Sequence, residues 1–260
     1  MSKLKETEDI VREVTDKLPK TTSAIDNVLS TIVNVFDVLL TPFQIAKIYK
    51  DQKLEDIKNH IIEKSKNIPE ENLKDSADLS IVGPTLEALK YTLLKDDLTE
   101  LFENLLVSSL DKTKNVFPGF VDIIRQLNSD EAKLLKFLAV NGTNYPVITL
   151  RCDKKDGNGG IDILTDFTSI GFGICEKPEL TTTYLVDLAR FGLIEFVSGK
   201  YLTNDKLYEP LINHEKIKSI NNKPFNDAGF NDYRIIKEYF RITEYGSAFI
   251  NACITNISIK

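Results

Sequence analysis

The sequence predicts a mainly α-helical protein with a smaller α+β part, in which an N-terminal helical bundle is followed by a winged-helix-like domain. Apolar residues recur at every third or fourth position through the first half of the 260 residues, which is the helical spacing. Runs rich in β-branched and aromatic residues occur only in the second half. Because a chain of this length with 42% hydrophobic residues can fill two cores, we expect domains over residues 1–127 and 128–260.

Residues 83–127 are the stretch on which the first domain depends. Acidic residues Asp96, Asp97 and Glu100 favour a helix N-terminus in its middle, and Pro118 with Gly119 breaks the pattern near its end. We therefore predict three short helices packed on one another, with Gly83 and Pro84 as a turn that leads into them. Their predicted core consists of Leu86, Leu89, Leu93, Leu98, Leu101, Phe102, Leu105, Leu106, Leu110, Phe120, Val121, Ile124 and Leu127.

The segment before this core is the most ambiguous one. Residues 2–18 indicate an amphipathic helix that ends near Pro19, and residues 24–49 then form the most apolar run. That run is long enough to span a membrane, yet Asp37 near its middle, together with Asn27, Asn34, Gln44 and Pro42, opposes insertion by an amount similar to the gain from its apolar side chains. A helix buried in the bundle explains the same residues and is our preferred interpretation.

One face of this segment carries the candidate functional residues. Ile25, Leu29, Ile32, Phe36, Leu39 and Phe43 follow alternating steps of three and four, which makes one continuous seam along a helix. We expect the seam to lie against the helices of residues 86–110 in the resting protein. Ile32, Phe36, Leu39 and Phe43 are the candidates for contact with a partner or a membrane.

Residues 44–66 mix apolar positions with lysines and acidic residues of both signs, which is typical of a solvated helix laced with ion pairs. Another helix is predicted after Asn128, where Ser129, Asp130 and Glu131 precede the apolar residues 132–140. Residues 145–150 and 161–165 should form a strand pair around a glycine-rich turn. That turn lacks the ligand order of a calcium loop, so a solvated hairpin is preferred.

The remaining elements predict a winged-helix-like layout. A helix over residues 178–191 is followed at once by residues 193–197, with Ser198 and Gly199 as a turn and Tyr201 and Leu202 returning as the second strand. Residues 206–232 are expected to be an inserted loop with a short helix, and residues 233–242 a returning strand. The last helix covers residues 243–254, and we expect its Phe249 and Ile250 to bury against the helix of residues 132–140.

Charge argues against nucleic acid as the partner. The chain carries a net charge of −6, and three basic residues are outnumbered by four acidic residues between positions 176 and 200. DNA affinity rests largely on neutralisation of phosphates by Lys and Arg, so a protein-contact role for the winged-helix-like domain is preferred.

No pattern in the sequence indicates catalysis. Three separate cysteines form no CxxC pair, the two histidines are expected at the surface, and no nucleophile, phosphate-loop or metal-protease motif is present. We therefore expect no enzyme activity, no cofactor and no metal. The charged start MSKLKETEDI is unlike an export leader, so the cytoplasm is the expected location.

Several segments in order carry a family resemblance. These are IVGPTLEAL, DLTELFENLLVSSLDK and FPGFVDIIRQLNSDEAKLLKFL, followed by LARFGLIEF and RITEYGSAFINAC. They are similar to the Abi-alpha (abortive infection alpha) family of bacterial proteins associated with defence against bacteriophage. Ile242 and Phe191 replace residues usual in the family but keep the apolar character.

The resemblance implies a non-enzymatic anti-phage protein whose helical part binds a protein partner or associates with a membrane. The alternative is a DNA-associated regulator that uses the winged-helix-like domain. A peripheral membrane contact and a homo-oligomer both stay open at this point.

Overall fold

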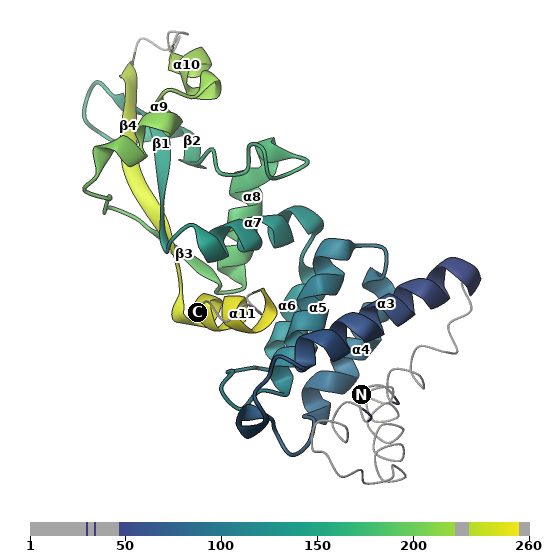
Figure 1. Ribbon diagram of the computed structural model, residues 1–260. Coiled ribbons are helices and arrows are strands. Elements are labelled where there is room, and N and C mark those ends of the chain that lie inside the picture. The colour runs from purple at the N-terminus through teal and green to yellow at the C-terminus, as the bar shows by residue number, and fades with distance from the viewer. Residues whose placement is uncertain (1–29, 31–33, 35–46, 222–228, 255–260) are drawn as a thin grey trace. The chain divides into compact units, whose positions relative to one another are not determined.

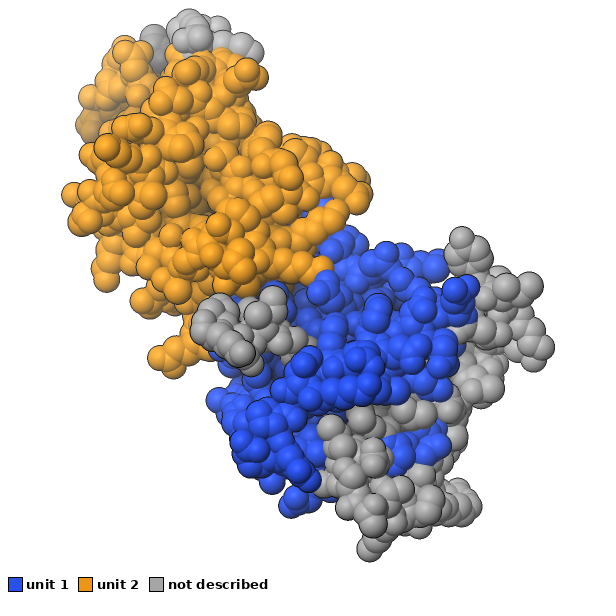
Figure 2. All heavy atoms as spheres, in the orientation of Figure 1, with its two compact units in different colours: residues 1–132, 248–260 blue, residues 133–247 orange. Residues whose placement is uncertain are grey.

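The structure is a computed structural model that describes residues 30, 34, 47–221 and 229–254. The chain divides into two units, residues 1–132 with 248–260, and residues 133–247 (Figure 2). The predicted division into residues 1–127 and 128–260 remains a prediction.

The first unit is helical. It contains α3 (Lys47–Ser65), the 3-10 helix η1 (Glu70–Asn72), α4 (Leu79–Thr92), α5 (Asp96–Ser109) and α6 (Gly119–Gln126) (Figure 1). The three helices predicted over residues 83–127 are therefore confirmed as α4, α5 and α6. Their predicted core residues are all buried, from Leu86 in α4 to Leu127 after α6. Phe102 and Phe120 are among the largest side chains with no exposed surface.

The predicted turn at Gly83 and Pro84 is wrong, because both residues lie inside α4. The helix begins after Asp78, whose side chain caps it by accepting from the Ser80 backbone N–H at 3.0 Å. Pro84 is the sixth residue of α4 and lacks the N–H that would bond to the Ser80 carbonyl, so the helix loses one backbone hydrogen bond. Ile81, Val82, Leu86 and Leu89 bury one face of α4, and that burial outweighs one missing hydrogen bond.

The second unit is built on a four-stranded antiparallel sheet of order β2-β1-β4-β3. Its strands are β1 (Asn144–Lys154), β2 (Gly160–Phe167), β3 (Ile194–Val197) and β4 (Phe230–Ile242). The predicted pair of strands is confirmed as β1 and β2. Gly157 and Gly159 have positive φ in the turn between them, which glycine adopts without strain.

The predicted hairpin from residues 193–197 to Tyr201 and Leu202 is wrong. β3 pairs with β4 instead, with Phe196 opposite Phe240. The returning strand comes more than thirty positions later because the intervening chain forms η3 (Asp205–Leu207), α9 (Glu209–Ile212) and α10 (Glu215–Asn221). These helices pack on the sheet through a core of Ile148, Phe167, Tyr208, Leu211 and Ile217. The fully buried Tyr208 donates from its hydroxyl to the Glu238 carbonyl at 2.9 Å.

The other helices of the chain are α7 (Ser129–Val140), η2 (Pro178–Leu180), α8 (Thr181–Arg190) and α11 (Glu244–Cys253). The predicted cap of α7 is confirmed, since Asn128 and Glu131 exchange hydrogen bonds at 2.8 and 3.0 Å. The described chain is thus a mixed α+β protein in which helices dominate. Within residues 47–221 and 229–254, none of the helices combines the length and hydrophobicity that a membrane crossing requires.

Candidate functional site

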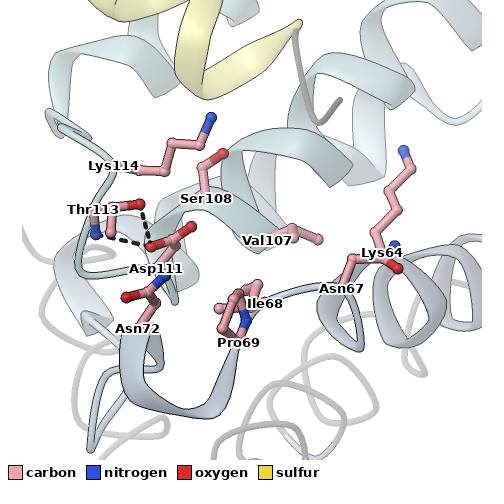
Figure 3. A pocket seen from close by; sticks show the side chains of 10 residues that line it. All are labelled: Lys64, Asn67, Ile68, Pro69, Asn72, Val107, Ser108, Asp111, Thr113 and Lys114. Carbon is pink, nitrogen blue, oxygen red and sulfur yellow. Dashed lines mark hydrogen bonds between the residues drawn. The ribbon is translucent and has the colours of Figure 1, made fainter. Parts of the chain in front are cut away.

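A hollow of about 300 Å³ opens in the first unit, between the end of α3, η1 and the loop that follows α5 (Figure 3). Ser108 and Lys114 lie on its side nearest α11, and Ile68 and Pro69 lie on the opposite side. It is lined by Lys64, Asn67, Ile68, Pro69, Asn72, Val107, Ser108, Asp111, Thr113 and Lys114. A volume of this size is at the lower end of the range of small-molecule sites.

Backbone hydrogen bonds hold the loops of this hollow in place. The Lys112 N–H donates to the Asn72 carbonyl at 2.7 Å, and the Lys74 N–H donates to the Leu110 carbonyl at 2.8 Å. One Asp111 carboxylate oxygen accepts from both the backbone N–H and the hydroxyl of Thr113, at 2.8 and 2.6 Å (Figure 3). The loop after α5 therefore forms a fixed wall of the hollow, because the Asp111 side chain and the backbone of residues 72–74 both restrain it.

A buried polar cluster lies beside the hollow on α5. The Glu103 side chain is only 5% exposed, and one of its oxygens accepts from the Lys64 ammonium at 2.8 Å. Its other oxygen lies 3.2 Å from Nδ1 of His60. Lys64 also donates to the Asn104 side-chain oxygen at 2.8 Å. A buried carboxylate needs such partners, so α3 and α5 are held in register by this cluster.

The same wall receives the end of α11. Asn104 donates to the Cys253 carbonyl at 2.9 Å, Ser108 to the Ala252 carbonyl at 2.7 Å, and Lys114 to the Asn251 carbonyl at 3.0 Å. The last carbonyls of a helix have no partner within the helix. Side-chain donors from α5 and its following loop therefore satisfy the end of α11.

A second hollow of about 300 Å³ shares Thr113 and Lys114 with the first one. Its remaining lining residues are Asn115, Ala248 and Asn251. Lys114 thus lies at the wall between two hollows and also contacts the end of α11. We name Lys64, Ser108, Asp111 and Lys114, with these two hollows, the α11-end site.

The polar side chains that line the α11-end site can donate and accept hydrogen bonds. Its polar lining groups are ammonium, hydroxyl, amide and one carboxylate, and none of the described residues that line the two hollows carries an imidazole or a thiol. Burial raises the pKa of the Cys253 thiol at the end of α11 well above its ordinary value, which suppresses its thiolate. Over the part of the chain that the structure describes, no group of three His, Cys, Asp or Glu side chains could hold a metal ion.

The residues predicted from the sequence as contact candidates are Ile32, Phe36, Leu39 and Phe43, and all four lie outside the described residues. Their seam and its burial against α4 and α5 stay predictions. His60 is 61% exposed, in keeping with its predicted surface position, although it also contacts Glu103. The predicted burial of Phe249 and Ile250 is confirmed, and the Phe249 ring meets Phe120 of α6 edge-on at 5.2 Å. The predicted contact of these residues with the helix of residues 132–140 stays a prediction.

Sequence reasoning missed the α11-end site. The available signal was polar residues at Glu103, Asn104 and Ser108 among the apolar positions of α5, all of them buried. Polar residues at buried helix positions require hydrogen-bond partners. The partner of Asn104 and Ser108, the end of α11, lies 149 and 144 positions away along the chain, so spacing alone does not identify it.

Comparison with known proteins gives one match. A family model described as abortive infection alpha matches residues 49–253, which include every element of the α11-end site. No curated protein and no solved structure was found to match the chain.

Proposed function

Because this chain belongs to the abortive infection alpha family, we propose that it is a bacterial phage-defence protein that acts without catalysis by binding a protein partner. The family match over residues 49–253 is the observation that carries the defence role. Support for binding comes from the α11-end site, whose lining side chains can donate and accept hydrogen bonds but include no paired nucleophile and base.

We propose that the second unit is a winged-helix-like module for protein contact. The support is its layout, in which α7 precedes β1, α8 directly precedes β3, and β4 lies between β1 and β3. Leu180 in η2 is 38% exposed and Val186 in α8 is 53% exposed. Arg190, also in α8, forms an ion pair with Asp187 at 2.7 Å. An exposed face with apolar residues and a neutralised arginine fits a protein surface better than a phosphate backbone.

We propose that the protein lies in the cytoplasm. For its helical part, association with a membrane is the alternative to binding a protein partner. It would use the seam with Ile32, Phe36, Leu39 and Phe43. The variant Phe36→Ala separates the two mechanisms. In our proposal it lowers the stability of the fold by about 3–5 kcal/mol and leaves liposome flotation of the protein unchanged. Unchanged stability with loss of flotation would instead assign the seam to the membrane.

Infection of cells that express the chain tests the defence role. We expect the plating efficiency of at least one phage from a diverse panel to fall, together with growth arrest of the infected cells. Cells with the empty vector and cells that express a chain truncated after residue 128 serve as controls. Normal plating of the whole panel on cells that contain folded protein would contradict the proposal.

A further inference from the structure

The turn between β1 and β2 carries an asparagine that is directly followed by glycine. Asn158 and Gly159 lie outside both strands, and both residues are exposed. The Asn158 backbone N–H donates to an Asp156 carboxylate oxygen at 2.9 Å, and the Gly159 carbonyl accepts from the Lys154 N–H at 2.8 Å. Among the described residues, the Asn158 side chain has no hydrogen-bond partner. Its amide is therefore free to rotate toward the backbone nitrogen of the next residue.

Gly159 leaves the space around that nitrogen open. Its φ is +92°, and a Cβ built at this position would meet no atom within 4 Å. Because glycine lacks a side chain, residue 159 neither shields its own nitrogen nor restricts the backbone rotation that brings it to the asparagine side chain.

The sequence contains a second pair of this kind, Asn141 and Gly142, between α7 and β1. Asn141 is exposed as well, and a Cβ at Gly142 would also meet open space. The Asn141 side-chain amide, however, donates to the Phe137 carbonyl at 2.7 Å. This hydrogen bond must break before the side chain can turn to the Gly142 nitrogen, so the two pairs differ in the freedom of the asparagine.

We propose that Asn158 is a site of spontaneous deamidation. The Gly159 nitrogen loses its proton to solvent and bonds to Cγ of Asn158. The bond from Cγ to Nδ2 then breaks, and the leaving nitrogen takes a proton from solvent and departs as ammonia, which leaves a five-membered succinimide. One water molecule opens this ring at either carbonyl to give aspartate or isoaspartate. The net reaction exchanges ammonia for water and needs no oxidant or reductant.

The products change the turn in two ways. Both carry a new negative charge next to the Asp156 carboxylate, which accepts from the backbone N–H of the same residue. In isoaspartate the main chain also runs through Cβ, so it is one atom longer between residues 158 and 159. That extra atom lies inside the loop that the Lys154 N–H closes by donating to the Gly159 carbonyl. Isoaspartate therefore weakens this hydrogen bond. The inference does not depend on the phage-defence role.

Incubation of the full chain at mildly alkaline pH, followed by peptide mass spectrometry, tests the site. We expect the peptide with residue 158 to gain about 1 Da, in a reaction that accelerates as pH rises because the attacking nitrogen must lose its proton. The conversion should be about fivefold faster than at residue 141, which is the rate equivalent of one hydrogen bond. A sample digested without incubation corrects for conversion during digestion.

Two controls separate the role of the fold from that of the sequence. In concentrated urea the bond from Asn141 to Phe137 is lost, so the two asparagines should convert at similar rates. Asn158→Gln should keep its mass, because its longer side chain would have to close a less favourable six-membered ring. Equal rates at the two sites in the folded protein, or conversion of Asn158 only in urea, would overturn the proposal.

Hydrogen exchange tests the effect on the turn. We expect the Lys154 amide to exchange faster in incubated protein that contains isoaspartate than in fresh protein. Incubated Asn158→Gln should show no such change. Unchanged exchange at Lys154 in protein with isoaspartate at residue 158 would refute the weakened hydrogen bond.

Discussion

Asp166, near the end of β2, has an unusual backbone conformation and a carboxyl group with a raised pKa. Among the described residues it is the non-glycine residue with positive φ, at 49°, a region that asparagine and aspartate tolerate better than other side chains. Its N–H donates to the Thr149 hydroxyl at 3.3 Å, and its carbonyl accepts from the Thr182 hydroxyl at 3.2 Å. Burial, with a smaller contribution from Glu238, raises the pKa of its carboxyl above the ordinary value of 3.8.

The raised pKa sets the direction of a pH effect. The folded protein binds this proton more readily than the unfolded chain does, so the stabilisation is full below pH 3.8 and declines as pH rises through the folded pKa. We therefore expect Asp166→Asn, which stays neutral, to raise the melting temperature at pH 7. The difference from the unmodified protein should shrink toward pH 3.

Asp166→Ala is the control, because it removes the same charge but lacks the polar side chain that favours positive φ. It should be less stable than Asp166→Asn by about 1 kcal/mol. A lower melting temperature for Asp166→Asn than for the unmodified protein at pH 7 would contradict the assigned role of burial. Thermal denaturation at both pH values measures all three proteins.

At the scale of elements, α11 is bound to the first unit by both polar and apolar contacts. Its end accepts three side-chain hydrogen bonds, and the fully buried ring of Phe249 lies edge-on to Phe120 with centroids 5.2 Å apart. This geometry is a favourable one for an aromatic pair. α11 therefore packs in one core with α5 and α6, which precede it by more than one hundred positions.

Phe249→Ala should lower the free energy of unfolding by about 3–5 kcal/mol, because it leaves a cavity beside Phe120. Glu244→Gln on the same helix is the control. Its side chain is exposed and keeps its size in the variant, so a change below about 1 kcal/mol is expected. Urea denaturation measures both variants. Equal effects would show that Phe249 does not anchor α11.

At the scale of the whole molecule, charge predicts no specific DNA binding. The net charge is −6, and the arginines near the sheet are paired: Arg151 with Asp153 and Asp162, and Arg234 with Asp153. Paired arginines contribute little to phosphate neutralisation. These ion pairs support the proposal that the second unit contacts a protein and not DNA.

We expect no submicromolar affinity of the full chain for duplex DNA at about 150 mM salt. Fluorescence anisotropy with a pool of random duplexes measures it, and a basic winged-helix protein provides the positive control. Tight binding that weakens steeply as salt is raised would favour the DNA-associated regulator over the protein-contact module.

The elements that could be predicted from the sequence are those whose buried face follows from the spacing of their own apolar residues. The helices α4, α5 and α6 and their leucine core were predictable, because a buried helix face repeats every three or four residues whatever it packs against. β1 and β2 were predictable for a similar reason, since β-rich runs flank a glycine-rich turn. The ordered segments from IVGPTLEAL to RITEYGSAFINAC also carried the family.

Tertiary structure decided what depends on a distant partner. Pro84 lies in a helix because the burial of its neighbours outweighs one lost hydrogen bond. β3 pairs with β4 and not with Tyr201 and Leu202, which are nearer in the sequence. Asn104 and Cys253 are joined by a hydrogen bond across 149 positions. Periodicity reports which face of an element is buried, but the partner on that face is selected by packing and hydrogen bonding across the whole chain. For that reason the α11-end site became visible only in three dimensions.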